Sequence, residues 1–350
     1  MTLAQIDTDI LYLCEEEVKT VCQRLDSVAL MHELFRLHGS GQTILPDEAY
    51  LAWTNPLGEG IRSLNMPGYV GGSIKLAGTK IINGNIANTQ RGLPRASGLT
   101  LLYDQNSGRV VCIMEGAYIS SLRTASVSLL AAQLCMGRPI DSAAVIGAGV
   151  LGQRHIELLI QHIPTLQKIS IFDLEPQRLV NLRTSLAPLL ENSSVVLVEE
   201  QSAQRAIQEA RLIIPATTTT TGYIPYSWLL PGAILINVSL DDPLPEVALK
   251  ADKIIVDDWD LVKNDTRRLL GRMYHTGELI GPHDPMPVSK QARRVDALLG
   301  EVATQQQVAR GSDDDIILVN PFGLSIEDIT LAAHVYQEAL TLQMGTYLRR

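Results

Sequence analysis

Residues 143–152 constrain the fold of this chain more than any other segment, because three glycines at a fixed spacing follow an apolar, strand-like run. The segment reads AAVIGAGVLG and leads into a helical pattern of apolar residues. In a strand–turn–helix unit, such glycines allow a tight turn, close approach of a pyrophosphate, and close packing of helix on strand. The pattern predicts a Rossmann-type dinucleotide-binding domain. The expected pyrophosphate contacts at the start of the helix are Gly147, Gly149, Val150, Leu151 and Gly152.

An acidic residue after the next strand-like run indicates which dinucleotide binds. Residues 168–172 read KISIF and are followed by Asp173, near the expected distance of about 20 residues from the first glycine. A carboxylate at this place accepts hydrogen bonds from the ribose 2′-OH of NAD and repels the 2′-phosphate of NADP. The sequence therefore favours NAD, with the alternative that Arg178 turns toward a 2′-phosphate.

Alternating strand-like and helical patterns continue beyond this point, as in βαβ units. Strand-like runs end at Thr217 and at Val238. Because doubly wound sheets bind ligands at the carboxyl ends of their strands, we expect both residues to contact the cofactor. The predicted fold class is α/β, with a Rossmann-type domain over residues 126–320.

The rest of the chain has a different texture and predicts a second, β-rich α+β domain for substrate binding and dimerisation. It comprises residues 1–125 and 321–350, the latter with a helical pattern over 326–348. A helical pattern spans residues 15–37, and short strand-like runs with a hairpin turn at 104–108 lie between residues 61 and 114. An open sheet edge near residues 99–114 would gain from pairing with a second copy, which favours a homodimer.

The composition excludes several classes of protein. The chain has 350 residues and a formal net charge of −9, which argues against a nucleic-acid surface. No apolar run approaches the roughly 20 residues that cross a bilayer, and the N-terminal residues 1–5 do not resemble a signal peptide. The four cysteines lack metal-ligand spacing, so we expect reduced thiols in a cytoplasmic protein without a bound metal. Local basic residues must hold any anionic substrate.

Two basic residues outside the glycine-rich segment are candidates for substrate binding. Lys80 precedes an apolar pair and an expected turn at Asn83-Gly84, a pattern that by itself favours a surface strand with an extended lysine. Arg123 lies near the start of a predicted helix over residues 120–136. A cation there opposes the helix dipole and suggests an anionic partner, and arginine binds carboxylates through two parallel hydrogen bonds.

Two adjacent acids, Asp241 and Asp242, follow the run that ends at Val238. They fit equally well a solvated turn or a carboxylate that faces the nicotinamide and accepts a proton. We expect no catalytic role for His155, in the helix after the glycines, or for His275.

Several motifs together resemble the ornithine cyclodeaminase/μ-crystallin family over nearly the full length of the chain. They are T-K-I-I-N-G (79–84), R-G-L-P (91–94), the 101–109 hairpin, L-R-T-A (122–125), the glycine segment, N-V-S-L-D-D-P (237–243) and F-G-L-S-I-E-D (322–328). The resemblance implies that Lys80 and Arg123 bind the substrate carboxylate. It also implies that an aspartate before Pro243 acts in proton transfer, with Asp241 matching the D-x-P spacing and Asp242 left open.

The resemblance is strongest to a dehydrogenase branch that oxidises N-(2-amino-2-carboxyethyl)-L-glutamate with NAD and makes 2,3-diaminopropionate for siderophores and peptide antibiotics. The carriers are residues 89–97, 114–117 and 149–155. Such a substrate has three carboxylates and calls for several cations. Additional substrate-binding candidates are therefore Arg62, Arg91 and Arg95, for each of which a plain surface charge is the alternative.

Two other functions fit the same resemblance. One is ornithine cyclodeamination or a related imine reduction, in which the cofactor is recycled. The glutamate that cyclodeaminases place before a Met-Pro pair is missing from R-S-L-N-M-P (62–67), which makes ornithine a poorer match. The other is a crystallin-like binding protein without catalysis, against which the retained Lys80, Arg123 and Asp241–Asp242 argue.

Overall fold

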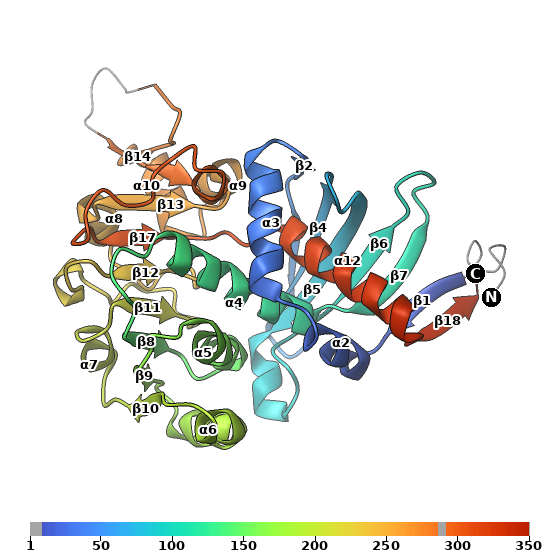
Figure 1. The fold of residues 1–350 in the computed structure, drawn as a ribbon, viewed down its shortest axis with the longest axis horizontal. Helices are drawn as coiled ribbons and strands as arrows, with labels where there is room; N and C mark the ends of the chain where they lie inside the picture. The colour runs from blue at the N-terminus through green and yellow to red at the C-terminus, as the bar shows by residue number, and fades with distance from the viewer. Residues whose placement is uncertain (1–8, 286–291, 350) are drawn as a thin grey trace. The chain divides into compact units, whose positions relative to one another are not determined.

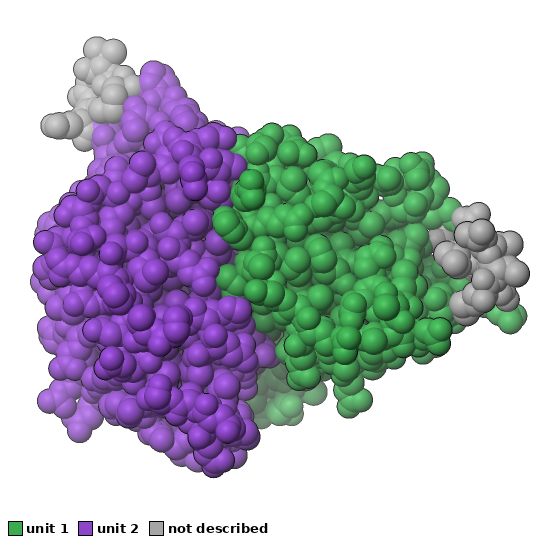
Figure 2. All heavy atoms as spheres, in the orientation of Figure 1, with its two compact units in different colours: residues 1–123, 324–350 green, residues 124–323 purple. Residues whose placement is uncertain are grey.

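The computed structural model describes residues 9–285 and 292–349, so the N-terminal residues assessed for a signal peptide lie outside it. The chain forms two compact units (Figure 2). Unit 1 consists of residues 1–123 and 324–350, and unit 2 of residues 124–323. The α/β fold class predicted from the sequence is confirmed.

Unit 1 is built on an eight-stranded sheet in the order β18-β1-β7-β6-β5-β4-β2, with β3 also paired to β4. Only the β1–β7 pair is parallel. The strands are β1 (Asp9–Leu13), β2 (Thr43–Ile44), β3 (Ala49–Thr54), β4 (Gly60–Val70), β5 (Leu76–Asn85), β6 (Ala96–Tyr103), β7 (Val110–Glu115) and β18 (Thr346–Arg349).

The strands differ from the sequence prediction in two ways that matter for the site. The expected turn at Asn83-Gly84 is wrong: both residues lie within β5, where Gly84 is paired with Arg62 and Ala96. The expected open edge near residues 99–114 is also wrong, since β6 and β7 each have a neighbour on both sides. The hairpin turn at 104–108 is confirmed, with Asp104 Oδ1 accepting hydrogen bonds from the turn backbone.

Helices α2 (Glu15–Cys22), α3 (Ser27–Gly39) and α12 (Ser325–Leu342) accompany this sheet (Figure 1). The single helix expected over 15–37 is broken, because Asp26 accepts a hydrogen bond from Ala29 N and starts a new helix. Helix α12 packs on β4, β5 and β6. It approaches closely at Gly68, where an added Cβ would lie 2.7 Å from Ser325 Oγ. It ends at Leu342, earlier than expected, in a left-handed Gln343, and the chain continues as β18.

Unit 2 contains an eight-stranded parallel sheet in the order β10-β9-β8-β11-β12-β17-β13-β16. The inner strands are almost wholly apolar and buried, as expected for a sheet covered on both faces. The strands are β8 (Ser142–Ile146), β9 (Lys168–Phe172), β10 (Val196–Glu199), β11 (Leu212–Pro215), β12 (Ile234–Ile236), β13 (Lys253–Val256), β16 (Ala297–Leu298) and β17 (Ile317–Val319).

Helices cover both faces of this sheet, with α4 and α5 on one side and α7 and α8 on the other (Figure 1). A separate pair, β14 (Leu279–Ile280) and β15 (Arg293–Arg294), lies outside the main sheet. The helices are α4 (Ala117–Leu134), α5 (Val150–His162), α6 (Pro176–Glu191), α7 (Ala203–Ile207), α8 (Pro245–Lys250), α9 (Trp259–Asn264), α10 (Leu269–His275) and α11 (Leu299–Ala303). Within the described ranges, no helix is long and apolar enough to cross a membrane.

The order of the first strands places β8 at the centre of the Rossmann arrangement, with β9 and β10 on one side and β11 and β12 on the other. The chain adds β9 and β10 outward from β8 and then returns to add β11 on the other side of β8, so the order of strands reverses between β8 and β11. Ligands of doubly wound folds bind at the carboxyl ends of the strands beside such a reversal. The glycine segment begins at this place.

The buried His155 of α5 makes the stability of the protein depend on pH. Its ring nitrogens bond to Leu151 O at 2.7 Å and Ser128 Oγ at 2.9 Å, and burial lowers its pKa to about 4. The folded protein therefore resists protonation below the ordinary pKa of about 6.5. We expect the free energy of unfolding to fall by about 2 kcal/mol between pH 7.5 and pH 5 through this group alone.

The measurement is denaturant unfolding at both pH values for the wild type and for His155→Gln. The variant should lose this part of the pH dependence. An equal change in both proteins would contradict the prediction.

Candidate active site

The three glycines between β8 and α5 have distinct geometries. Gly147 has a φ of +107°, and a Cβ there would lie 2.7 Å from Ala216 O. A Cβ at Gly152 would lie 1.9 Å from Gly147 O, so this glycine is needed for close packing. A Cβ at Gly149 would meet nothing within 4 Å, which leaves open space in front of the first turn of α5. The N–H groups of that turn, which lack helical acceptors, belong to Val150, Leu151 and Gly152.

The carboxylate of Asp173 is fixed directly to the glycine turn. Its Oδ2 accepts a hydrogen bond from Ala148 N at 2.7 Å, and its Oδ1 accepts one from Glu175 N at 2.8 Å. Arg178, the candidate for a 2′-phosphate contact, instead pairs with Glu175 at 2.8 Å. The end of β9 therefore presents an acid, which suits a ribose 2′-OH.

Hydroxyl groups at the ends of β11 and β12 surround the buried Asp242. Its Oδ1 accepts hydrogen bonds from Thr217 Oγ1 at 2.7 Å and Tyr223 OH at 3.1 Å. Ser239 Oγ accepts from Thr217 N at 2.7 Å and donates to Pro215 O at 3.0 Å, which ties the two strand ends together. Burial raises the pKa of Asp242, and these hydroxyls partly offset the shift. Val238, half-buried, precedes Ser239 in the same loop.

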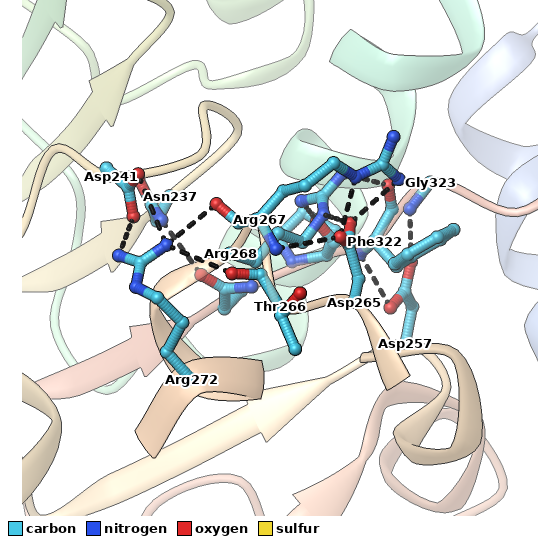
Figure 3. A network of polar contacts seen from close by, with 12 residues as sticks. Asn237, Asp241, Asp257, Asp265, Thr266, Arg267, Arg268, Arg272, Phe322 and Gly323 are labelled. Atoms are coloured by element: carbon cyan, nitrogen blue, oxygen red, sulfur yellow. Dashed lines mark hydrogen bonds and ion pairs between the residues drawn. The ribbon is translucent and has the colours of Figure 1, made fainter. Parts of the chain in front are cut away.

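The neighbouring acid, Asp241, has a charged partner instead. Arg272 of α10 contacts it with both terminal nitrogens, Nη2 to Oδ1 at 2.5 Å and Nη1 to Oδ2 at 3.5 Å (Figure 3). The arginine side chain is 44% exposed and that of Asp241 8%. Sequence reasoning missed Arg272, because nothing local links α10 to a loop 31 residues earlier.

A continuous set of polar contacts fixes this arginine (Figure 3). Arg272 Nη1 donates to Arg267 O at 2.8 Å, and the Arg267 side chain binds Asp265. Arg268 donates to the carbonyls of residues 321 and 322, at 3.1 and 2.8 Å. The turn before α10 is thereby attached to the last residues of unit 2. Arg272 is held at one end by Asp241 and at the other by the carbonyl of Arg267.

Unit 1 contains a buried cluster of two cations and two acids. Lys80 Nζ lies 2.8 Å from Asp328 Oδ2, and Arg123 Nε lies 3.2 Å from the same oxygen. Arg123 Nη1 also lies 2.5 Å from Glu327 Oε2. The acid side chains are fully buried, and those of Lys80 and Arg123 are 3% and 8% exposed. The pattern-based interpretation of Lys80 as a surface lysine is wrong.

The cluster is balanced in charge, and its shape depends on α12. Burial and the nearby Arg123 lower the pKa of Lys80, and Asp328 counteracts this. Arg123 lies in the second turn of α4, which begins at Ala117, so the helix-dipole argument does not apply to it. Glu327 and Asp328 were not identified as site residues, although they lie in a motif that carries the family resemblance. The separation of 248 residues between Lys80 and Asp328 hides their contact from the sequence.

The three further arginines of unit 1 are in different situations. Arg91 is exposed and pairs with Glu59. Arg62 and Arg95 are half-buried and close enough that Arg62 lowers the pKa of Arg95, after burial. Over residues 9–285 and 292–349, no group of three or more His, Cys, Asp or Glu side chains has a metal-binding arrangement.

Known proteins resemble this chain over almost all of its length. The model of the ornithine cyclodeaminase/mu-crystallin family matches residues 10–343. The N-((2S)-2-amino-2-carboxyethyl)-L-glutamate dehydrogenase of Staphylococcus aureus is 29% identical, over 98% of this chain and 99% of the relative. The alanine dehydrogenase of Archaeoglobus fulgidus is 26% identical, over 97% and 98%.

Solved structures agree in fold. The crystal structure of CmnK has a TM-score of 0.87 and 32% identity, and covers 97% of this chain and 98% of its own. The Delta(1)-pyrroline-2-carboxylate reductase of Thermococcus litoralis, in complex with NADH and L-proline, has a TM-score of 0.83 and 21% identity, over 97% and 100%. The second likeness concerns the fold alone.

Two acids on α12 provide a test of the buried cluster. Asp328 pairs with Lys80 at 2.8 Å in the interior, and Glu338 pairs with Arg24 at 2.8 Å near the surface. Removing Asp328 leaves the buried Lys80 without its acid partner, so Asp328→Ala should lower the free energy of unfolding by about 3–5 kcal/mol. Glu338→Ala should lower it by no more than about 1 kcal/mol.

Urea unfolding measures both losses. Asp328→Asn, which keeps the shape and removes the charge, serves if the alanine variant does not fold. Equal losses at positions 328 and 338 would contradict the cluster.

Proposed function

Because this chain belongs to the ornithine cyclodeaminase/mu-crystallin family, we propose that it is an NAD-dependent oxidoreductase that acts on the C–N bond of an amino-acid substrate. The observation that carries the proposal is the glycine turn of unit 2. Gly147 and Gly152 are required by packing, Gly149 leaves space for a phosphate, and Asp173 is fixed beside the turn. When bound, NAD supplies the hydride acceptor. The groups that would hold it are the first turn of α5, Asp173, Thr217 and Val238.

The proposed substrate is N-(2-amino-2-carboxyethyl)-L-glutamate, a secondary amine with three carboxylates. The relative of that name matches the whole chain. Oxidation removes hydride from the glutamyl Cα and leaves an imine. Water adds to the imine carbon, the C–N bond breaks, and the products are 2-oxoglutarate, L-2,3-diaminopropionate, NADH and a proton. The amine product would serve siderophore or peptide-antibiotic biosynthesis.

Lys80 and Arg123 are proposed to hold one carboxylate of the substrate. A lysine ammonium has three donors and an arginine guanidinium five, so each can bind its acid partner and a ligand together. Because Glu327 and Asp328 fix both cations, the carboxylate would be held in one orientation. Such positioning of the reacting C–H contributes strongly to rate.

Asp241, and not Asp242, is proposed as the group that takes a proton from the attacking water. Asp242 is fully buried, and the hydroxyls of Thr217 and Tyr223 engage it. Asp241 contacts the half-exposed Arg272, so its ion pair borders on solvent. Asp242 would then hold the loop, and Asp241 would act on the substrate.

A turnover assay tests this function. The purified protein with NAD and N-(2-amino-2-carboxyethyl)-L-glutamate should produce NADH and 2-oxoglutarate in equal amounts. Asp241→Asn should lower kcat by about 10²–10⁴-fold, the usual contribution of a general base, while NAD affinity stays unchanged. Conversion of ornithine to proline without net NADH would identify a cyclodeaminase. NAD binding without turnover of either compound would identify a binding protein.

We further propose that the protein is a homodimer through β3 of unit 1. Every residue of this strand is exposed, including Leu51 (58%) and Trp53 (44%). A strand of this kind is covered by a partner in stable proteins. An alanine dehydrogenase with NAD has been described as a dimer.

A charge in this strand should therefore disrupt the dimer. Trp53→Lys is expected to halve the mass in sedimentation or light scattering, whereas Val308→Lys, at an exposed apolar residue of unit 2, should not change it. A wild-type monomer, or a Trp53→Lys variant of unchanged mass, would count against β3 as the interface.

A further inference from the structure

Three charged residues follow one another where β9 ends and α6 begins. Asp173 is the first residue after the strand, Glu175 is the N-cap of α6, and Arg178 lies in the first turn of that helix. All three belong to unit 2. Their hydrogen bonds form one continuous series that starts at the glycine turn.

Asp173 is the fixed end of this series. Its Oδ2 accepts a hydrogen bond from Ala148 N at 2.7 Å, and its Oδ1 accepts one from Glu175 N at 2.8 Å. The first bond joins the carboxylate to the glycine turn, and the second sets the position of the Glu175 backbone. Because each carboxylate oxygen has a further lone pair, a ribose hydroxyl can still bind to Asp173.

The side chain of Glu175 reaches forward along the chain to Arg178. Arg178 Nε donates to Glu175 Oε2 at 3.0 Å, and Arg178 Nη2 lies 2.8 Å from Glu175 Oε1. These two contacts are the parallel pair of hydrogen bonds that an arginine makes with a carboxylate. The backbone supports the pair, since Arg178 N donates to Glu175 O at 3.0 Å. The side chain of Glu175 does not cap its own helix, so both of its oxygens engage the arginine.

This ion pair determines what the 2′ position of a dinucleotide would meet. An acid at this strand end binds the 2′-OH of NAD, whereas a nearby arginine accommodates the 2′-phosphate of NADP. The chain has both kinds of residue here, and Arg178 is the only basic residue in the segment 173–182. Its charge is balanced by Glu175, so a 2′-phosphate would meet the carboxylate of Asp173 without a cation that offsets it.

We propose that Glu175 is a second determinant of NAD selectivity, which acts by holding Arg178 in the ion pair. This rests on the proposed function, in which the first turn of α5 and Asp173 hold NAD. Asp173 discriminates directly, through the ribose hydroxyl. Glu175 discriminates indirectly, because it retains the arginine that would otherwise bind the 2′-phosphate. The chain therefore contains the cation that NADP needs and is prevented from using it.

The exposure of the pair allows its role in binding to be separated from any role in folding. The side chains of Arg178 and Glu175 are 42% and 63% exposed. Exposed ion pairs contribute little to stability, so removing Glu175 should leave the fold and its Tm unchanged. A change in nucleotide binding then reports on the released arginine.

The test is equilibrium binding of NADH and NADPH to the full-length protein, followed by the fluorescence of the reduced nicotinamide. The wild type should prefer NADH by at least about tenfold, the loss expected where a charged group lacks its partner. Glu175→Gln keeps the shape and removes the charge. It should strengthen NADPH binding by about 3–10-fold, because the arginine no longer has to leave an ion pair. NADH, which has no 2′-phosphate, should bind as before.

The gain must depend on Arg178. It should disappear in the double variant Glu175→Gln/Arg178→Gln. Arg178→Gln alone should change NADPH binding by less than about twofold at 0.15 M salt, because the arginine is already engaged and solvent screens the remaining Glu175. If the two residues acted only through net charge, Arg178→Gln would weaken NADPH binding by the factor by which Glu175→Gln strengthens it. The double-mutant cycle separates these cases.

The matched control is Glu209→Gln, which removes an exposed acid that lies 2.9 Å from Lys168. Lys168 is the first residue of β9, so this control releases a cation at the end of the strand away from Asp173. It should leave the affinities for NADH and NADPH unchanged.

Three results would overturn the proposal: a wild-type preference for NADPH, unchanged NADPH binding in Glu175→Gln, or a gain that persists in the double variant. A wild type that binds neither nucleotide would count against the NAD-dependent function instead. The role of Glu175 is then tested by calorimetry with adenosine 2′,5′-bisphosphate and adenosine 5′-monophosphate, which differ in the 2′-phosphate alone. Failure of these fragments to bind as well would overturn both.

Discussion

The structure of unit 1 depends on the neutralisation of two buried cations. Lys80 on the central β5 and Arg123 in α4 are removed from water, and burial of an unpaired charge costs several kcal/mol. Both acids that compensate them come from one turn of α12. The start of this helix is set by Ser325, which donates to Pro67 O at 2.7 Å, and by the close approach at Gly68. A small residue in β4 and a helix more than 250 residues later in the chain thus fix the same pair of cations.

In unit 2, the two adjacent acids in the loop after β12 have different kinds of partner. Asp242 points into the hydroxyls of Thr217 and Tyr223, so its carboxylate holds the loops after β11 and β12 together. Asp241 has an arginine partner that is partly in solvent. One residue of displacement along the loop changes a carboxylate held by hydroxyl groups into one held by an arginine.

Local patterns in the sequence predicted the parts of the fold that local geometry determines. The roles of Gly147 and Gly152 depend on contacts with adjoining strand ends, and the spacing alone implies them. Family resemblance, and not the local pattern, predicts a binding role for Lys80, because the sequence around a buried lysine and around a surface lysine is alike. Arg272 and Asp328 could not be predicted, since each meets its partner only through tertiary packing. The end of α12 was missed because Gln343, a good helix former, takes a left-handed conformation there.

The buried cluster of unit 1 and the half-buried Arg62 and Arg95 can make different contributions to recognition of an acid. Lys80 uses one donor on Asp328, and a balanced cluster exerts little attraction at a distance. Its contribution is geometric, since the directions of its donors are fixed. Among the residues that the structure describes, Arg62 and Arg95 carry charge without an acid partner, in a protein whose net charge is −9. Because the overall field repels anions, attraction must be local, and it is strongest where no acid of the chain competes with the ligand. Orientation of an acid is therefore assigned to the buried cluster, and its attraction to cations outside the cluster.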